Sequence, residues 1–401
     1  MLKKRFAVSV SVLALGIGLV PLQLRAQRSL TRMEQVGKAI FNDHSLSNPE
    51  GQACSSCHGK QVGFTGPNSR INRETAVYPG AVASRFGNRK PPAAAYAGDV
   101  PVLDYNPALS EWTGGLFWDG RATGWTLGDP LAEQALGPFL NPLEQNNPDA
   151  ASVCQAVETA PYSALFETVW GPGAIDCVGD VQGTYERIGF SISAYEHSAE
   201  VNPYSSRYDA YLLGEVSLNA AETQGLQLFE GVAGCASCHS VTAAPSGGAP
   251  LFTDFSYANL GLPKNENNPF YTMPEEWNPD GAKWVDPGLG NTLRNLGYGV
   301  DVYETEWGKH RVPTLRNVDR RPGRGAFVKA FGHNGYFKSL AQLVHFYNTR
   351  DVPGAGWMGV PWPAAEIPQN VSNEIGDLGL TLQEEAALVA FLQTLSDGYT
   401  P

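Results

Sequence analysis

The sequence predicts a mostly α-helical protein whose two halves repeat one helical pattern and are connected by long loops. A residue that can cap a helix stands three positions before a glutamate at both 31–34 and 219–222, which is the pattern of a capping box. Apolar residues recur at helical spacing near the end of each half, over 188–195 and 388–395. The chain also has 44 Gly and 29 Pro without a low-complexity block, which indicates loops organised around a large cofactor.

The first segment, residues 1–26, has the features of a signal peptide. Lys3, Lys4 and Arg5 precede an apolar run over 6–20, and small residues near position 26 offer a cleavage point. No later stretch reaches the roughly 20 apolar residues that a membrane helix needs. We therefore expect a soluble protein without a membrane span, periplasmic or otherwise exported.

The charge of the chain narrows the class of partner. The formal net charge is -12, and removing residues 1–26 makes it more negative, since that segment holds basic but no acidic residues. A surface this acidic argues against binding to nucleic acid or to membrane headgroups. It leaves room for a basic protein partner.

Each predicted first helix leads into a pair of cysteines. The string Gly37-Lys-Ala-Ile-Phe41 precedes Cys54, and the similar string Gly225-Leu-Gln-Leu-Phe229 precedes Cys235. Each half of the chain is therefore expected to contain a helix followed by a cysteine motif, in the same order.

The two cysteine motifs have the sequence CxxCH. They read Cys54-Ser-Ser-Cys57-His58 and Cys235-Ala-Ser-Cys238-His239. Two thiols at this spacing reach the two vinyl groups of one haem, and the next residue places an imidazole beneath the iron. Zinc ribbons also use CxxC pairs, but those lie closer in sequence, and a redox dithiol would not be followed twice by His. We predict two covalently bound c-type haems.

Two cysteines remain outside these motifs. In an oxidising compartment, Cys154 and Cys177 are expected to form one structural disulfide.

A helix before the haem motif and a helix after it, in tandem, indicates two cytochrome c-type domains. We expect residues 27–212 to form the first domain and residues 213–401 the second.

Longer strings resemble one known family. These are Phe117-Trp118-Asp119-Gly120-Arg121, Gln134-Ala-Leu-Gly-Pro138 with Glu144 after it, and Val312-Pro-Thr-Leu-Arg-Asn317. With the tandem CxxCH motifs, they resemble the bacterial di-haem cytochrome c peroxidase and MauG family over roughly residues 33–396. The resemblance implies a peroxidatic first haem, an electron-transfer second haem, and haems near the domain interface with a Trp between them.

Three side chains match functional positions of that family. Glu144 matches a catalytic carboxylate, which would shuttle a proton between the two peroxide oxygens, and Gln134 matches a neighbouring hydrogen-bonding amide. Trp118 matches the residue that couples the haems. The competing interpretations are a solvated loop acid for Glu144 and ordinary packing for Trp118.

The first haem differs from that of ordinary members of the family. Those proteins resemble one another in a His after the first CxxCH that covers the iron, but between His58 and His197 this chain has neither His nor Met. We expect the first haem to be open without reductive activation, as the resemblance to MauG implies.

The second haem is expected to have an unusual ligand. After His333-Asn-Gly335, the chain resembles MauG in placing Tyr347 where ordinary peroxidases place Met. A phenolate stabilises oxidised iron, whereas a thioether raises the potential. His239 and Tyr347 are thus the predicted ligands. The competing candidates are His345, His310, Met273 and Met358, although His345 would point away from Tyr347 on one helix.

The calcium site of the family is doubtful here. Its amide position aligns with Lys90 or Asn88, and its Thr-x-Pro segment aligns with Val328-Lys-Ala330. Lysines do not suit a hard cation site, so we expect weak calcium binding or none.

Three functions remain open on the sequence. The first is a MauG-like enzyme that uses hydrogen peroxide to oxidise Trp or Tyr side chains of a secreted partner protein, which acts as electron donor. The second is peroxide detoxification with electrons from a small cytochrome or copper protein. The third is a non-enzymatic electron carrier or redox sensor, against which Glu144 and Gln134 argue.

Overall fold

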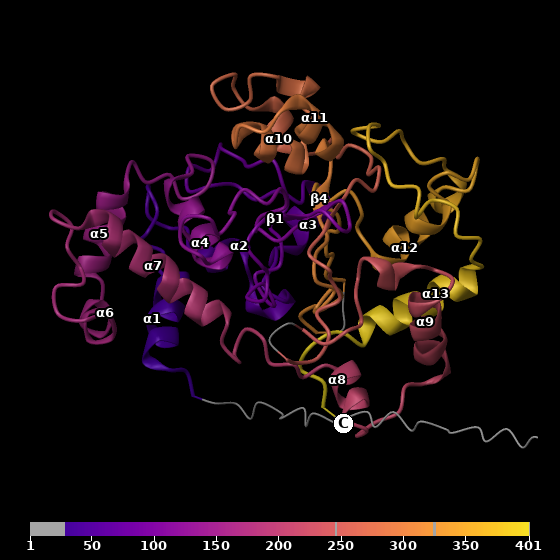
Figure 1. Ribbon diagram of the computed structural model, residues 1–401, viewed down its shortest axis with the longest axis horizontal. Coiled ribbons are helices and arrows are strands. Elements are labelled where there is room, and N and C mark those ends of the chain that lie inside the picture. The colour runs from indigo at the N-terminus through magenta and orange to yellow at the C-terminus, as the bar shows by residue number, and fades with distance from the viewer. Residues whose placement is uncertain (1–28, 245–246, 324–325, 401) are drawn as a thin grey trace, which may run out of the picture.

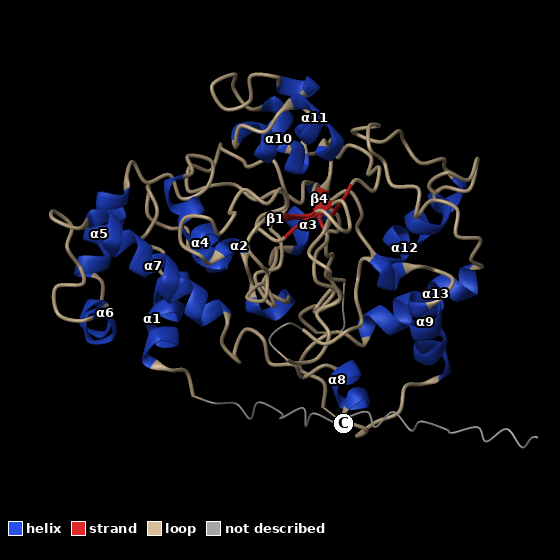
Figure 2. Ribbon diagram, viewed as in Figure 1, coloured by secondary structure: helices blue, strands red, loops and turns tan. Residues whose placement is uncertain are grey.

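The computed structural model describes residues 29–244, 247–323 and 326–400, and helices make up most of its regular structure (Figure 2). The predicted signal peptide, residues 1–26, lies outside the described residues. The α-helices are α1 (Arg32–Phe41), α2 (Cys54–Cys57), α3 (Ser69–Glu74), α4 (Pro130–Leu140), α5 (Ala150–Thr159), α6 (Ser163–Trp170), α7 (Val181–Glu196), α8 (Arg207–Leu212), α9 (Ala220–Glu230), α10 (Gly288–Asn295), α11 (Val300–Tyr303), α12 (Leu340–Thr349) and α13 (Leu382–Gln393). Short 3-10 helices are η1 (Lys60–Val62), η2 (Cys235–Ser237), η3 (Pro269–Thr272), η4 (Gly281–Lys283), η5 (Glu304–Glu306) and η6 (Trp357–Gly359).

Each half of the chain is built on a crossing of two helices. Helix α1 packs on α7, and α9 packs on α13 (Figure 1). The capping boxes predicted at 31–34 and 219–222 are confirmed, and Thr381 and Glu384 form another at the start of α13. The sequence patterns therefore located these four helices correctly.

A glycine permits close approach at both crossings. A Cβ atom on Gly37 would lie 1.8 Å from the carbonyl oxygen of Ser191, and one on Gly225 would lie 2.0 Å from that of Ala387. Four residues after each of these glycines, an aromatic ring packs against the crossing helix. The rings of Phe41 and Tyr195 are 5.4 Å apart between centroids. The equivalent pair in the second half, Phe229 and Phe391, is 5.2 Å apart.

The buried apolar side chains form two large clusters. The first joins α1, α4, α5, α6 and α7, with Phe139, Phe166 and Ile188 among its fully buried members. The second joins α8, α9, α12 and α13 around Phe391. In Figure 1 the first group of helices lies on the left and the second on the right. The domain boundary placed at residue 212 stays a prediction.

Short strands, which the sequence analysis did not predict, lie between the two groups of helices. β1 (Asp104–Asn106) pairs with β2 (Glu111–Thr113), and β3 (Tyr257–Ala258) pairs with β4 (His310–Arg311), both antiparallel. In the second pair Tyr257 stands opposite Arg311. Strands of two or three residues are too short for alternation of polar and apolar residues to be recognised.

Cys154 and Cys177 form a disulfide with an S–S distance of 2.00 Å. It connects α5 to the loop before α7. No helix in the described ranges is both long enough and apolar enough to cross a membrane.

Candidate haem sites

The first CxxCH motif presents its side chains to a cavity. Cys54 and Cys57 lie on α2, and His58 ends that helix by donating its backbone N–H to the carbonyl of Cys54 (2.9 Å). The ring Nδ1 of His58 lies 3.0 Å from the carbonyl oxygen of Phe64. Because a carbonyl only accepts, Nδ1 carries the proton and Nε2 remains free to ligate a metal. Cys54, Cys57 and His58 all line a cavity of about 1010 Å³, its open mouth included.

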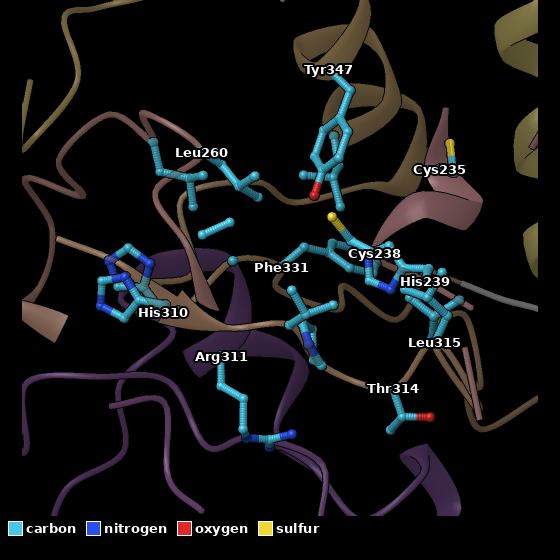
Figure 3. Close-up of a pocket in the computed structure, with 18 of the residues that line it drawn as sticks. Cys235, Cys238, His239, Leu260, His310, Arg311, Thr314, Leu315, Phe331 and Tyr347 are labelled. Atoms are coloured by element: carbon cyan, nitrogen blue, oxygen red, sulfur yellow. The ribbon is translucent and has the colours of Figure 1, made fainter. Parts of the chain in front are cut away.

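The second motif repeats this arrangement. The backbone N–H of His239 donates to the carbonyl of Cys235 (2.9 Å), and its Nδ1 donates to the carbonyl of Phe252 (2.8 Å). Cys235, Cys238 and His239 line a second cavity of about 1430 Å³, its open mouth included (Figure 3). Burial lowers the pKa of His58 and of His239, which keeps both imidazoles neutral and able to act as ligands.

The chemistry of these residues fits haem better than zinc. Burial raises the pKa of Cys57 and of Cys235 to about 12, so both thiols hold their protons while no metal is bound. Neither CxxCH motif brings three ligand atoms together for a shared ion within the described ranges. A large cavity lined by protonated thiols and one free imidazole nitrogen fits a covalently attached haem.

Two of the predicted catalytic residues lie in the first cavity. Gln134 lines it from α4, and Glu144 lines it from the loop that follows α4. Asn141 ends α4 and donates from Nδ2 to Glu144 Oε1 (3.0 Å), which orients the carboxyl group. Burial raises the pKa of Glu144, while Arg121 and Asn141 oppose that rise. The carboxyl group can therefore change protonation closer to neutral pH than an exposed one.

His58 is the only imidazole that lines the first cavity among the described residues, and no thioether lines it. The described part of the chain thus brings no imidazole besides His58 and no thioether to this cavity. Tyr78 also lines it, with its hydroxyl oxygen accepting from the backbone N–H of Asn68 (2.7 Å).

Trp118 lies in the wall between the two cavities and lines both of them. Its indole Nε1 donates to the carbonyl oxygen of Lys90 (2.9 Å). Its own carbonyl accepts from the backbone N–H of Arg311 on β4 (2.9 Å). The structure thus places Trp118 between the two groups of CxxCH residues.

Tyr347 lies on α12 and points its hydroxyl group into the second cavity (Figure 3). Its position differs from those of the competing candidates. The Nδ1 of His345 lies 2.9 Å from a carboxylate oxygen of Glu385 and its Nε2 lies 2.8 Å from the carbonyl oxygen of Ala355, and the residue does not line the cavity. Met358 is 87% exposed. Met273 is buried but does not line the cavity either. Burial raises the pKa of Tyr347, so its ionisation requires a cation such as iron.

His310, the remaining candidate, also lines the second cavity but is paired with His333. The two rings stack with centroids 3.6 Å apart and an interplanar angle of 5°. Figure 3 shows His310 at the end of the cavity opposite His239. Its position therefore does not match that of a ligand facing His239.

Comparison with known proteins identifies the family. The sequence model described as di-haem cytochrome c peroxidase matches residues 31–217. The methylamine utilization protein MauG of Paracoccus denitrificans is 33% identical over 370 residues, which is 90% of this chain and 88% of that protein. The chain belongs to the di-haem cytochrome c peroxidase family. As a member it is a peroxidase that carries two covalently bound c-type haems and has hydrogen peroxide as substrate.

Other proteins similar to this di-haem peroxidase are named cytochrome-c peroxidase or diheme peroxidase. The cytochrome-c peroxidase IdrP1 of Pseudomonas sp. (strain SCT) is 26% identical over 90% of this chain and 80% of that protein. Among solved structures, the diheme peroxidase BthA of Burkholderia thailandensis superposes with a TM-score of 0.76 and 31% identity, covering 93% of this chain and 87% of that one. The fold is thus shared over nearly the whole chain.

Lysines occupy the region where a calcium site of this peroxidase family was expected. Lys329 is buried and donates from Nζ to the carbonyl oxygens of Val62 (2.9 Å) and Asn317 (2.6 Å). Lys90 donates from Nζ to the carbonyl of Pro91 (3.0 Å). Oxygens that could bind a cation therefore already accept hydrogen bonds from lysine side chains, which supports the expectation of weak calcium binding or none.

One buried polar cluster was missed by the sequence analysis. Asp286, His310 and His333 lie together beside the second cavity, and Arg89 holds both carboxylate oxygens of Asp286 at 2.6 Å. Because the two rings are parallel and 3.6 Å apart, an ion in the plane of one ring lies outside the plane of the other. The three residues come from separate segments, so no local spacing could reveal the cluster.

Proposed function

We propose that this di-haem peroxidase uses hydrogen peroxide to oxidise Trp or Tyr side chains of a secreted partner protein through long-range electron transfer. The observation that carries the proposal is the phenol of Tyr347 in the second cavity, which no thioether lines among the described residues. A phenolate ligand stabilises oxidised iron, whereas a thioether favours the reduced iron that receives electrons from a high-potential cytochrome.

In this proposal the CxxCH residues hold the haems. Cys54 and Cys57 would form thioethers to the first haem, and His58 would ligate its iron. Cys235, Cys238 and His239 would hold the second haem in the same way, and Tyr347 would supply a further ligand to its iron. The haems, when bound, supply the iron centres that take up peroxide and exchange electrons.

The protein side chains supply proton transfer and the electron path. The Glu144 carboxylate accepts a proton from the near peroxide oxygen and delivers it to the far oxygen, so that water can leave. Gln134 donates a hydrogen bond to the bound oxygens. Reduction of one peroxide to two waters takes two electrons and two protons. The electrons come from the partner and reach the first site through Trp118.

The second candidate function is peroxide detoxification with electrons from a small cytochrome or copper protein. Relatives named cytochrome-c peroxidase, such as IdrP1, favour it. The non-enzymatic function considered from the sequence does not fit a chain that belongs to a peroxidase family.

One assay separates the two enzymatic functions. Peroxide is added to the di-haem protein with a candidate partner, and the aromatic residues of the partner are analysed by mass spectrometry. Oxidised Trp or Tyr, at a level that falls in Trp118→Phe, supports the proposed function. An unmodified partner, together with rapid consumption of a reduced cytochrome, would replace it with detoxification.

We also infer that the protein is exported to the periplasm or beyond. The inference rests on the signal-peptide features of residues 1–26 and on the Cys154–Cys177 disulfide, because disulfides persist in oxidising compartments. The mass of the protein recovered from a periplasmic extract should correspond to a chain that begins near residue 27. A retained N-terminus would contradict export by this route.

A further inference from the structure

The wall between the two cavities contains a second functional candidate beside Trp118. Lys90 also lines both cavities. It comes from the loop before β1, and its backbone N–H donates to the carbonyl of His333 in the second half of the chain (2.9 Å). Lys90 is therefore held at the same junction as the indole that the proposed function uses as an electron relay.

Lys90 contacts Trp118 in two ways. Its carbonyl oxygen accepts the indole N–H at 2.9 Å. Its ammonium nitrogen lies 5.5 Å from the centroid of the indole ring. A cation at this distance from the ring face stabilises the neutral indole and opposes the removal of an electron from it.

The surroundings do not neutralise this ammonium group. Its nitrogen donates to the carbonyl of Pro91 (3.0 Å) and lies 3.4 Å from Thr65 Oγ1, and it forms no ion pair with a carboxylate of the described residues. Burial lowers the pKa of Lys90 to about 8, so the amine is still protonated at pH 6.5. The charged or titratable groups near it are His58, Arg89, which is bound by Asp119 and Asp286, His310, Arg311, Lys329 and His333.

We propose that Lys90 is a positioning residue that restrains the oxidation of Trp118, by fixing the indole N–H with its carbonyl oxygen and by opposing the loss of an electron with its ammonium charge. This inference rests on the proposed relay function of Trp118. It adds that the chain sets the rate of electron exchange between the haems with a charge of its own.

Oxidation of Trp118 and its return to the neutral indole each move one electron. One electron leaves the indole of Trp118 for the oxidised first haem, and one electron from the second haem replaces it. The indole proton stays in place because its acceptor is a backbone carbonyl, which is not a base at this pH. The oxidised indole thus carries a positive charge for as long as it exists, and the nearby ammonium group repels that charge.

The test compares side chains of similar length with and without charge at pH 6.5. The ferric di-haem protein is mixed with one equivalent of peroxide, and the spectrum of the second haem is followed by stopped flow. Lys90→Met should speed electron exchange by roughly 10- to 100-fold, as expected for loss of one charge near 5.5 Å. Lys90→Arg, which keeps the charge, should remain near the wild-type rate. Lys90→Gln serves as a second neutral variant if Lys90→Met loses haem.

A second readout does not depend on turnover. In the Lys90→Met variant, Trp118 should acquire more oxygen adducts per equivalent of peroxide than in the wild type, as measured by peptide mass spectrometry. The matched control is Lys283→Met, which removes an exposed lysine of η4 and should change neither readout.

The outcomes separate this inference from the function on which it rests. If Trp118→Phe slows exchange but both neutral variants match the wild type or are slower, Lys90 has no restraining role and the inference is overturned. If Trp118→Phe leaves exchange unchanged, the relay function fails and the role of Lys90 fails with it. In the double variant of Lys90→Met and Trp118→Phe, the acceleration should be absent, because the two residues act as one unit.

Discussion

Glu144 and Asn141 show how a loop residue can acquire acid–base properties. The end of α4 fixes Asn141, which donates to Glu144 at 3.0 Å, while burial raises the pKa of the carboxyl group. A base must be ionised to accept a proton. The peroxide reaction should therefore weaken as the pH falls through this raised pKa, above the usual value of 4.5.

Glu144→Gln should slow the reaction with peroxide by roughly 10²- to 10⁴-fold and remove its loss in acid, because the amide cannot shuttle a proton. Stopped-flow spectra across a pH series provide the measurement. Glu158→Gln, on the exposed face of α5, is the control and should behave as the wild type. An unchanged rate in Glu144→Gln would return Glu144 to a structural role.

Tyr347→Met should leave the first haem reactive towards peroxide but raise the reduction potential of the second haem, because a thioether replaces an anionic oxygen donor. A redox titration followed by absorbance measures this change. The matched control is Tyr211→Phe, which alters a 38% exposed tyrosine. Identical potentials in Tyr347→Met and the wild type would show that another group faces His239.

Residue types at fixed spacing were the part of the site that the sequence could predict. Each CxxCH lies within one short helical turn, so its three side chains share a cavity without help from the rest of the fold. Lys90 shows the opposite case. Its contacts with Thr65, Trp118 and His333 join separate segments of the chain. No local spacing around a single loop lysine predicts such contacts.

The helix crossings determine how closely the elements in each half approach. Gly37 and Gly225 were read from the sequence only as members of a repeated string. In the structure each leaves room for a carbonyl oxygen of the crossing helix. Periodicity located the helices, but which residue meets the partner backbone depends on the crossing itself, which no local pattern encodes.

Gly37→Ala and Gly225→Ala should each lower the free energy of unfolding by about 1–3 kcal/mol or more, because the added methyl group forces the helices apart. This cost exceeds the gain of about 1 kcal/mol that alanine brings to a helix interior. Denaturant unfolding of the haem-loaded protein measures it. Thr223→Ala, on the exposed side of α9, should change the free energy little, whereas an equal effect at all three positions would contradict this account.

At the scale of the whole molecule, the two cavities meet at one shared wall. Lys90 and Trp118 line both cavities, and β4 supports the wall through the bond from Arg311 to the carbonyl of Trp118. The repeat in the sequence predicted two similar sites. It could not predict how they face each other, because that depends on loops such as the one holding Lys90, which lies outside the repeated strings.

Each pair of CxxCH cysteines should hold one haem independently of the other pair. Cys54→Ala with Cys57→Ala should remove the first haem and the reaction with peroxide. Cys235→Ala with Cys238→Ala should remove the second haem and leave the first reactive. Haem that resists acid-acetone extraction, counted by absorbance, measures each loss, and zinc in place of haem would contradict the assignment of both sites.

The shared wall predicts that electrons pass between the two haems of one chain and not between chains. A mixture of these two single-haem variants should therefore not recover the electron exchange of the intact protein. The path through Trp118 is buried, since the side chain lies in a wall and the residue is 8% exposed, so a haem on another molecule cannot approach it closely. Stopped-flow spectra of the mixture with one equivalent of peroxide test this. Exchange that rises with the concentration of the second variant would show that electrons pass between molecules, and Trp118 would then not be required as a relay.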